Sequence, residues 1–162
     1  MPGLPAYVGL GSNLRDPPAR LREAFAALAS LPASRLMQQS ALYGSPPMGP
    51  VAQPDYCNAV AELLTELEPE ALLGELRSLE QRLGREPPRQ RWGPRVIDLD
   101  LLAVGAHQVA APALTLPHPG IAERAFVLFP WCELAPGFAV PGLGTVAALA
   151  ARLPATAAWR LA

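Results

Sequence analysis

The sequence predicts an α+β domain with a ferredoxin-like βαββαβ core, in which an antiparallel sheet carries both core helices on one face and extra helices follow at the C-terminus. One observation predicts the fold class, and a second predicts the number of domains. Strand-like segments and amphipathic helical segments follow each other in the order strand, helix, strand, strand, helix, strand. The chain has 162 residues, enough for one core but too few for two typical domains, so we expect a single domain over residues 1–162.

The first half of the core is predicted from three segments. Residues 5–11 are expected to form a strand, residues 17–31 an amphipathic helix and residues 35–44 a second strand. Asp16, followed by Pro17, is expected to cap the helix, because aspartate favours the N-cap position and proline favours the first helical turn.

The second half of the core begins after a loop with four prolines at residues 45–55, a length that is often functional. A third strand is expected at 56–65, a second helix at 69–84 and a fourth strand at 95–104. The apolar face of the third strand is expected to comprise Cys57, Ala59, Ala61 and Leu63. The apolar face of the fourth strand is expected to comprise Ile97, Leu99, Leu101 and Ala103. Beyond the core we expect an extended segment at 107–115 and helices at 123–135 and 145–153.

The composition limits the classes of function. A formal net charge of −1 argues against a general nucleic-acid binder, and no apolar run is long enough to span a membrane. The N-terminus lacks the pattern of a secretory signal, so a cytoplasmic location is expected. Cys57 and Cys132 are then expected to be buried, reduced thiols. All 13 basic residues are arginine, so a basic side chain that binds phosphate here would be a planar guanidinium group.

The fourth predicted strand carries the strongest functional pattern. Asp98 and Asp100 lie two residues apart, so their side chains share one face of the strand. Two close carboxylates repel unless a cation lies between them, and Mg²⁺ is usually held by one or two carboxylates together with substrate phosphates. They could be solvent-facing residues of a one-sided sheet, but aspartate is depleted in strands, which favours metal ligation. The segment predicts metal-assisted chemistry on a polyphosphate.

Three other features leave alternatives open. Glu80 falls on the apolar stripe of the second helix, where it either marks the edge of the stripe or has a function. The loop at 85–95 is either a solvated charge cluster or a lid over phosphates, and the cost of exposing Trp92 favours the lid. The arginines of this loop are Arg85, Arg89, Arg91 and Arg95. His118 lies between two prolines and is either structural or a phosphate contact.

Five motifs follow one another along the chain. They are Val-Gly-Leu-Gly-Ser-Asn-Leu at 8–14, Ser-Pro-Pro-Met-Gly-Pro at 45–50, Gln-Pro-Asp-Tyr-Cys-Asn-Ala at 53–59, Arg-Trp-Gly-Pro-Arg-Val-Ile-Asp-Leu-Asp at 91–100 and Leu-Pro-His-Pro at 116–119. Together they resemble the 6-hydroxymethyl-7,8-dihydropterin pyrophosphokinase family of folate biosynthesis. The fourth motif is highly specific, and the others are moderate alone but strong together.

The resemblance implies the reaction, the cofactor and the partners. The reaction is the transfer of pyrophosphate from ATP to the hydroxymethyl group of 6-hydroxymethyl-7,8-dihydropterin, with release of AMP. Asp98 and Asp100 would hold two Mg²⁺ ions that bind with ATP. The expected partners are the two small-molecule substrates, with no nucleic acid and no membrane, and the enzyme is expected to be a monomer.

The resemblance also implies the roles of other residues. The catalytic residues would be Arg85, Trp92 and Arg95. The pterin would be bound by Tyr56, Asn58, Phe126, Ser45 and Met48. ATP would be bound by Arg77, Glu80, Arg91, Leu101, Thr115, His118 and Arg124. The chain departs from the family pattern where Arg77 stands in place of a glutamine, Pro87 and Pro88 replace basic lid residues, and Ala113 occupies a position that can be arginine. Arg77 or Arg89 would then supply charge to the site.

Two rival functions remain open from the residues alone. Ferredoxin-like sheets with exposed aromatic residues often bind RNA. Here the sheet face that is expected to be open carries Tyr56, Asn58 and the two aspartates, so it is acidic rather than basic. Another Mg²⁺-dependent transferase on the same fold is the second rival, and its product would be ADP or pyrophosphate rather than AMP.

Overall fold

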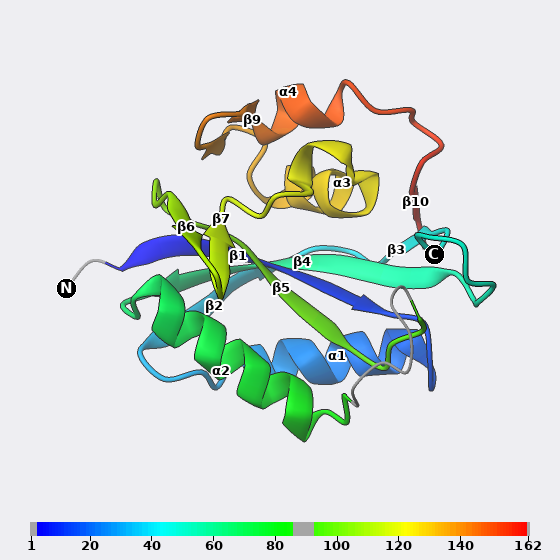
Figure 1. The fold of residues 1–162 in the computed structure, drawn as a ribbon, viewed down its shortest axis with the longest axis horizontal. Helices are drawn as coiled ribbons and strands as arrows, with labels where there is room; N and C mark the ends of the chain where they lie inside the picture. The colour runs from blue at the N-terminus through cyan, green and yellow to red at the C-terminus, as the bar shows by residue number, and fades with distance from the viewer. Residues whose placement is uncertain (1–2, 86–92, 162) are drawn as a thin grey trace.

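A six-stranded antiparallel sheet forms the centre of the computed structural model, which describes residues 3–85 and 93–161 (Figure 1). Strand β4 pairs with β1 on one side and with β2 and β3 on the other, while β1 also pairs with β5. The strands are β1 (Leu4–Ser12), β2 (Ser34–Gln39), β3 (Tyr43–Ser45), β4 (Tyr56–Thr65), β5 (Asp98–Val104) and β10 (Trp159–Arg160). This arrangement contains the predicted ferredoxin-like βαββαβ core, so the fold class is confirmed.

Helices α1 (Pro17–Leu28) and α2 (Pro69–Arg82) pack on one face of the sheet (Figure 1). Both start at the predicted proline, and each ends two or three residues before the predicted end. Their apolar stripes form one buried core with the inward-facing residues of β1, β4 and β5. The predicted apolar face of β4 lies in this core: Cys57, Ala59, Ala61 and Leu63.

The predicted N-cap position of α1 is confirmed at Asp16, but capping by its side chain is not found. Asp16 precedes the helix, but its backbone is left-handed, with φ 60°, and its side chain makes no capping hydrogen bond. A capping residue normally has an extended backbone, which turns its side chain toward the first amides of the helix. Pro17 and Pro18 both lack an amide hydrogen, so the first turn of α1 offers fewer donors to cap.

The predicted second strand is two strands. Residues 35–44 divide into β2 and β3, and both pair with β4. Ser40 lies between them, where its amide donates to the Val60 carbonyl oxygen at 3.0 Å and its hydroxyl accepts from the Val60 amide at 2.9 Å. The side chain of Ser40 therefore replaces a backbone acceptor at the interruption.

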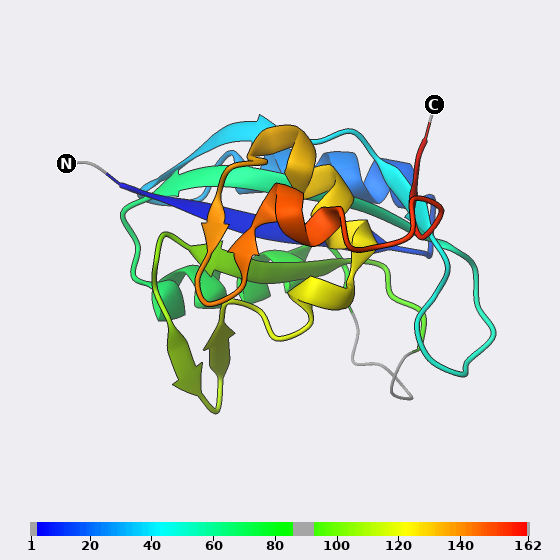
Figure 2. The same ribbon diagram turned by 90° about the horizontal axis from the view of Figure 1, so that it is seen from above.

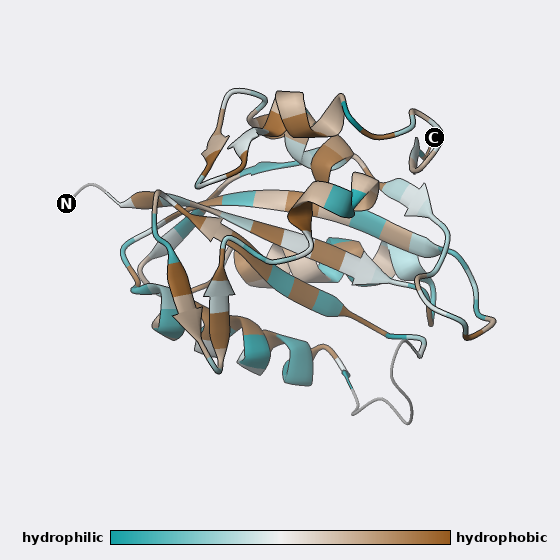
Figure 3. Cartoon of the chain, turned by 45° about the horizontal axis from the view of Figure 1, so that its top comes forward, coloured by the Kyte–Doolittle hydropathy of each residue, from teal (hydrophilic) through white to brown (hydrophobic). Residues whose placement is uncertain are grey.

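Strand β5 contains a bulge at Leu102. Tyr7 of β1 is opposite Ala103, whereas the next residue, Val8, is opposite Leu101, so Leu102 is the extra residue. The bulge reverses the alternation along the second half of β5. The predicted place of Ala103 beside Ile97, Leu99 and Leu101 is wrong, because Val104 lies in their core and Ala103 in the opposite one. Figure 3 shows alternating hydrophilic and hydrophobic bands only at the start of β5.

The second face of the sheet is only partly open. Helices α3 (Ala125–Leu134) and α4 (Val146–Ala150) lie over it when the molecule is seen from above (Figure 2). They enclose a second core around Trp131, whose ring centroid lies 5.1 Å from that of Tyr7. The prediction of an open face therefore holds only for the end of the sheet that α3 and α4 leave uncovered.

The remaining elements follow the predicted order. The extended segment at 107–115 is a hairpin of β6 (Val109–Ala111) and β7 (Leu114–Leu116), followed by the 3-10 helix η1 (Ile121–Glu123). A two-stranded sheet of β8 (Ala139–Val140) and β9 (Gly144–Thr145) leads into α4. Both cysteines are free thiols. The prediction that they are buried is confirmed for Cys57 but is wrong for Cys132, which is partly exposed. Within the described residues, no helix has the length and apolarity needed to cross a membrane.

Candidate active site

Two cavities adjoin at the uncovered end of the sheet and share Asp100 and His118. The first has a volume of about 350 Å³ and the second about 220 Å³. The predicted site residues that line the first cavity are Ser45, Met48, Tyr56, Asn58, Arg85, Arg95, Asp98, Asp100, His118, Arg124 and Phe126. Those that line the second are Arg77, Asp100, Leu101, Thr115 and His118. The fold thus collects residues from widely separated segments into one composite site.

One side of the first cavity combines aromatic and amide groups. Tyr56 and Asn58 alternate with core residues along β4, and both line the cavity with Phe126 of α3. Asn58 is buried, and its Nδ2 donates to the Ser45 hydroxyl at 2.8 Å. Gly11 lies beside the side chains of Asn58 and Tyr56, since a Cβ at that position would be in ordinary contact with Asn58 Oδ1 at 3.5 Å and with Tyr56 at 3.6 Å. This side has the shape and polarity that suit a flat heterocycle with hydrogen-bonding edges.

Other residues that line the first cavity are charged. Asp98 Oδ1 lies 3.2 Å from Arg95 Nη1 and 3.4 Å from Arg85 Nη1. Burial, together with the nearby Asp100 carboxylate, raises the pKa of Asp98 to about 6 despite these two arginines. Burial also raises the pKa of Asp100. A bound cation would relieve the cost of keeping both carboxylates ionised, so the electrostatics of this pair fit a metal site.

The donor set also fits a magnesium ion. Asp98 and Asp100 both line the first cavity from the start of β5, as their two-residue spacing predicts. Among the described residues there is no group of three or more His, Cys, Asp or Glu side chains that could hold a metal. Two carboxylates alone suit a hard cation that keeps water and takes its other ligands from substrate phosphates, which is typical of Mg²⁺.

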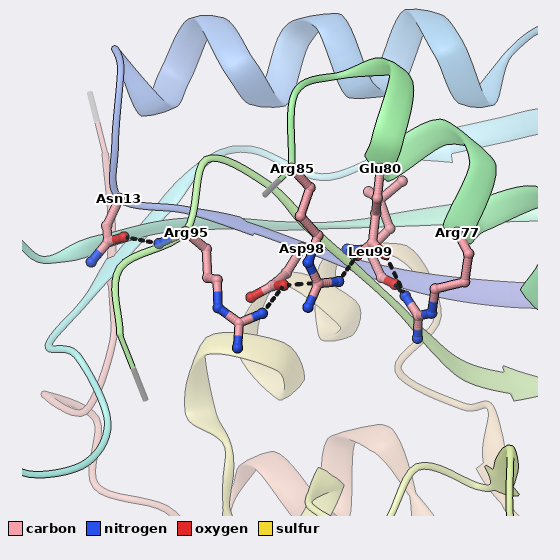
Figure 4. Close-up of polar contacts among 7 residues, drawn as sticks. All are labelled: Asn13, Arg77, Glu80, Arg85, Arg95, Asp98 and Leu99. Carbon is pink, nitrogen blue, oxygen red and sulfur yellow. Dashed lines mark hydrogen bonds and ion pairs between the residues drawn. The ribbon is translucent and has the colours of Figure 1, made fainter. Parts of the chain in front are cut away.

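Glu80 is buried at the centre of the polar contacts in Figure 4, with 2 % of its surface exposed. Its Oε2 accepts from the Leu99 amide at 2.7 Å and pairs with Arg85 Nη1 at 2.7 Å. Its Oε1 pairs with Arg77 Nη1 at 2.8 Å. Its place on the apolar stripe is therefore not merely an edge effect, because the carboxylate ties α2 to the strand between the two aspartates.

The end of α2 explains where Arg85 lies. Gly84 has a left-handed backbone, with φ 95°, and the Arg85 amide donates to the Glu80 carbonyl oxygen at 2.9 Å. This is the Schellman arrangement of a helix C-terminus, which glycine adopts without steric cost. The turn brings the Arg85 side chain back beside Glu80 and Asp98.

His118 borders both cavities as a neutral imidazole. Burial, with help from the charges of Arg124 and Arg77, lowers its pKa to about 4. Its Nδ1 accepts a hydrogen bond from the Gly120 amide at 3.2 Å. In the neutral ring the proton is then on Nε2, which is left to donate to a ligand oxygen.

One long cationic side chain, that of Arg77, lines the second cavity. Arg77 Nη1 donates to the Leu99 carbonyl oxygen at 2.9 Å and contacts Glu80, although 46 % of the side chain is exposed. Thr115 of β7 and Leu101 of β5 line the same cavity. Arg124, which borders the first cavity, lies with its guanidinium carbon 5.8 Å from the Phe126 ring centroid, within cation–π range.

Two of the predicted site residues, Arg91 and Trp92, lie outside the described residues, as do Arg89 and the two prolines of the proposed lid. The lid therefore stays a prediction. Sequence reasoning placed one further residue, Asn13, in the first motif but gave it no role in the site. Asn13 is buried and connects two loops that border the first cavity. The sequence signal was weak, because asparagine after Gly-Ser is an ordinary turn residue.

Comparison with known proteins agrees with this architecture. The family model described as 7,8-dihydro-6-hydroxymethylpterin-pyrophosphokinase (HPPK) matches residues 7–136. A curated 2-amino-4-hydroxy-6-hydroxymethyldihydropteridine pyrophosphokinase from Methylorubrum extorquens is 47 % identical over 137 residues, which cover 85 % of this chain and 86 % of that protein. The protein of the same name from Haemophilus influenzae is 43 % identical over 136 residues, or 84 % of each chain.

A solved structure has the same fold. The crystal structure of wild-type Plasmodium falciparum HPPK-DHPS with STZ-DHP superposes with a TM-score of 0.72 over 93 % of this chain, at 12 % identity. This chain spans 43 % of that longer protein, so the likeness concerns the fold of one part. From the family match and the identity to these relatives, the chain belongs to the 7,8-dihydro-6-hydroxymethylpterin-pyrophosphokinase family.

Proposed function

We propose that this chain transfers pyrophosphate from ATP to the hydroxymethyl group of 6-hydroxymethyl-7,8-dihydropterin and releases AMP, as a step of folate biosynthesis. Family membership supports the reaction. The observation that carries the proposal is the meeting of two cavities at Asp100 and His118, because a two-substrate transfer needs both substrates to converge on one point.

The first cavity suits the pterin. In this assignment Tyr56 and Phe126 contact the ring faces, Asn58 hydrogen-bonds its edge, and Ser45 and Met48 complete the wall. The fixed contact between Asn58 and Ser45 supports the assignment, since it holds the amide in one orientation. A pre-oriented amide discriminates among heterocycles by their pattern of donors and acceptors.

The second cavity and the boundary between the two suit ATP. Arg77, Leu101 and Thr115 would contact the nucleoside part, and Glu80 would act by holding Arg77 and Arg85. His118 and Arg124 would bind phosphate oxygens, the histidine through its neutral Nε2 donor. Arg91 and Trp92 are proposed to close over the phosphates, as the resemblance implies.

The metal part of the proposal is two Mg²⁺ ions that bind together with ATP. Asp98 and Asp100 would hold them, which is supported by the raised pKa of both carboxyl groups and by the oxygen-only donor set. When bound, such ions neutralise phosphate charge and lower the pKa of the acceptor hydroxyl. Competition with the cation would also loosen the ion pairs between Asp98 and the two neighbouring arginines, freeing Arg85 and Arg95 to contact phosphate oxygens.

The chemistry is a single in-line displacement. The pterin hydroxyl oxygen forms a bond to the β-phosphorus, while the bond from the β-phosphorus to the oxygen bridging to the α-phosphorus breaks and AMP leaves with that oxygen. The hydroxyl proton is released to solvent. Arg85 and Arg95 would neutralise charge on the transferring group. We assign no side chain as general base, because positioning and electrostatic stabilisation can suffice for phosphoryl transfer. We further propose that the enzyme acts as a cytoplasmic monomer with a single domain over residues 1–162.

The direct test is incubation with ATP, Mg²⁺ and the reduced pterin, followed by separation of the nucleotides. AMP should form in equal amount to the pyrophosphorylated pterin and should require both the pterin and the metal. ADP or free pyrophosphate as the nucleotide product would contradict the proposal and favour another transferase. Retention of RNA on a filter, with no AMP formed, would favour the nucleic-acid alternative.

A further inference from the structure

We propose that Asn13 is a positioning residue that couples the pterin side of the site to its phosphate side. The inference rests on the proposed function, since it concerns how the two substrates influence each other. Asn13 follows the end of β1 and is 2 % exposed. It touches neither aspartate, and its effect would reach both substrates through the loops that it joins.

The Asn13 side chain uses both its donors and its acceptor between two loops. Its Nδ2 donates to Gln53 Oε1 and to the Pro54 carbonyl oxygen, each at 2.9 Å. Its Oδ1 accepts from the Arg95 amide at 2.9 Å, a contact drawn in Figure 4. Its own amide also donates to the Arg95 carbonyl oxygen at 3.0 Å. A single amide therefore fixes residues 53–54 relative to residue 95.

Both loops border the first cavity, one next to Tyr56 and the other next to Asp98. Residues 53–54 lead directly into Tyr56, and the same loop contributes Met48 to the cavity wall. Residue 95 carries a guanidinium group 3.2 Å from the Asp98 carboxylate. A displacement of either loop must stretch the hydrogen bonds of Asn13 or move the other loop. Ordering of one loop by its substrate would therefore favour the bound position of the other.

The expected consequence is positive coupling between the substrates, in which a bound nucleotide tightens pterin binding and the reverse. The coupling should depend on the donors of Asn13, which hold residues 53–54, as well as on its acceptor, which holds residue 95. Asn13→Asp separates these parts, because the carboxylate keeps the acceptor for the Arg95 amide but loses both donors. Asn13→Ala removes the side-chain hydrogen bonds to both loops without adding a charge, and it leaves the backbone hydrogen bond to the Arg95 carbonyl oxygen in place.

The experiment measures pterin affinity with and without an inert nucleotide. The proposed reaction breaks the bond between the α- and β-phosphates, so α,β-methylene-ATP with Mg²⁺ is the suitable probe. In the wild-type protein the nucleotide should tighten pterin binding at least fivefold. In Asn13→Asp and Asn13→Ala this factor should fall by at least threefold, and KM for the pterin should rise more than kcat falls.

The matched control is Thr145→Ala, which removes the hydrogen bond from the Ala148 amide to the Thr145 hydroxyl at the start of α4. This variant should lose stability but keep the wild-type coupling factor and KM. If the Asn13 variants keep the wild-type factor, or if Thr145→Ala loses it equally, the inference is overturned. If the wild-type protein produces no AMP, the proposed function fails instead.

A measurement on the unaltered protein covers the case in which the Asn13 variants do not fold. Pterin alone should slow hydrogen exchange of the Arg95 amide at least threefold, because this amide is held by Asn13, whose donors hold the loop that leads into Tyr56. The Gly44 amide in the short strand β3 supplies an internal comparison for the direct effect of pterin on its own wall. Unchanged exchange at Arg95 with slowed exchange at Gly44 would overturn the coupling.

Discussion

The buried Glu80 carboxylate accepts a 2.7 Å hydrogen bond from the Leu99 amide, the backbone group that separates Asp98 from Asp100. The same carboxylate also pairs with Arg77 and Arg85. One acid on α2 thus sets both the position of the proposed metal-binding strand and the direction of two cationic side chains.

Replacing Glu80 should separate these two effects. Glu80→Leu leaves the buried Leu99 amide without its acceptor, which should lower the free energy of unfolding by about 1–3 kcal/mol. Glu80→Gln keeps an acceptor for the Leu99 amide but loses the charge that pairs with Arg77 and Arg85, as Glu80→Leu also does, so it should cost less than Glu80→Leu by about the worth of the Leu99 hydrogen bond. Urea denaturation would measure the difference. Equal losses of stability in the two variants would show that the Leu99 hydrogen bond is not what makes Glu80 important.

Loss of Asp98 should remove catalysis while leaving the pterin side of the cavity intact. We expect Asp98→Ala to nearly abolish AMP formation, because the proposed Mg²⁺ site loses one of its two carboxylates. Pterin binding, measured without nucleotide, should remain detectable because Tyr56, Asn58 and Phe126 stay in place in the cavity that they share with Asp98. An active Asp98→Ala enzyme would overturn the metal assignment.

The low pKa of His118 predicts a pH-dependent contribution to stability. Its pKa is about 4 in the folded protein against 6.5 for the free group, so between these values the unfolded chain binds more protons. Stability from this residue is therefore complete above pH 6.5 and is lost as the pH falls toward 4. His118→Asn should flatten the profile, reducing the loss between pH 7 and pH 5 by on the order of 1–2 kcal/mol. Chemical denaturation at the two pH values would test this, and parallel profiles would contradict it.

Arg77 should contribute to nucleotide binding more than to the chemical step. It borders the second cavity and is anchored by the Leu99 carbonyl oxygen and Glu80. Because nearly half of the side chain is exposed, we expect Arg77→Gln to cost about 1 kcal/mol, or roughly fivefold in KM for ATP. Single-turnover rates at saturating ATP should change less than twofold. A large fall in that rate with unchanged KM would place Arg77 in the transition state instead.

The C-terminal strand should support the pterin pocket from behind. Strand β10 pairs with β3, and Trp159 packs so closely on Gly44 that a Cβ there would lie 2.3 Å from the indole nitrogen. The next residue of β3 is Ser45, which holds Asn58. A chain ending at Ala158 should bind the pterin several-fold more weakly while its affinity for ATP changes little. Leu143→Ala, at an exposed position on the far hairpin, is the control.

The parts of the fold that follow a simple alternation were predictable from the sequence. The apolar face of β4 and the shared face of Asp98 and Asp100 are read directly from a period of two. The bulge was not, because Leu101 to Val104 are apolar on both faces of β5 and give no sign of the reversal. The packing of α3 on the second sheet face was also not predicted. Helix α3 is apolar on all sides, so its sequence pattern does not indicate which surface it packs against.

The site was predictable only in part for a similar reason. A charged residue on an apolar helix stripe, such as Glu80, or in a strand, such as the two aspartates, can be recognised from the sequence alone. Asn13 does not, because its importance comes from two loops that meet it only in three dimensions. The roles of the other site residues came from family resemblance, and the geometry adds which of them share a cavity.

The bulge at Leu102 divides β5 into two segments with different tolerances to change. Before it, alternation must be kept, because a shift of one residue would turn the aspartates into the leucine core. After it, Val104 packs in the core beneath α1 and α2, and Ala103 packs in the core beneath α3 and α4. Residues of α3 and α4 can therefore be changed without altering the register of Asp98 and Asp100. Deleting Leu102 would remove the bulge, so that a change of register after residue 101 could no longer be absorbed before it reached Asp98 and Asp100.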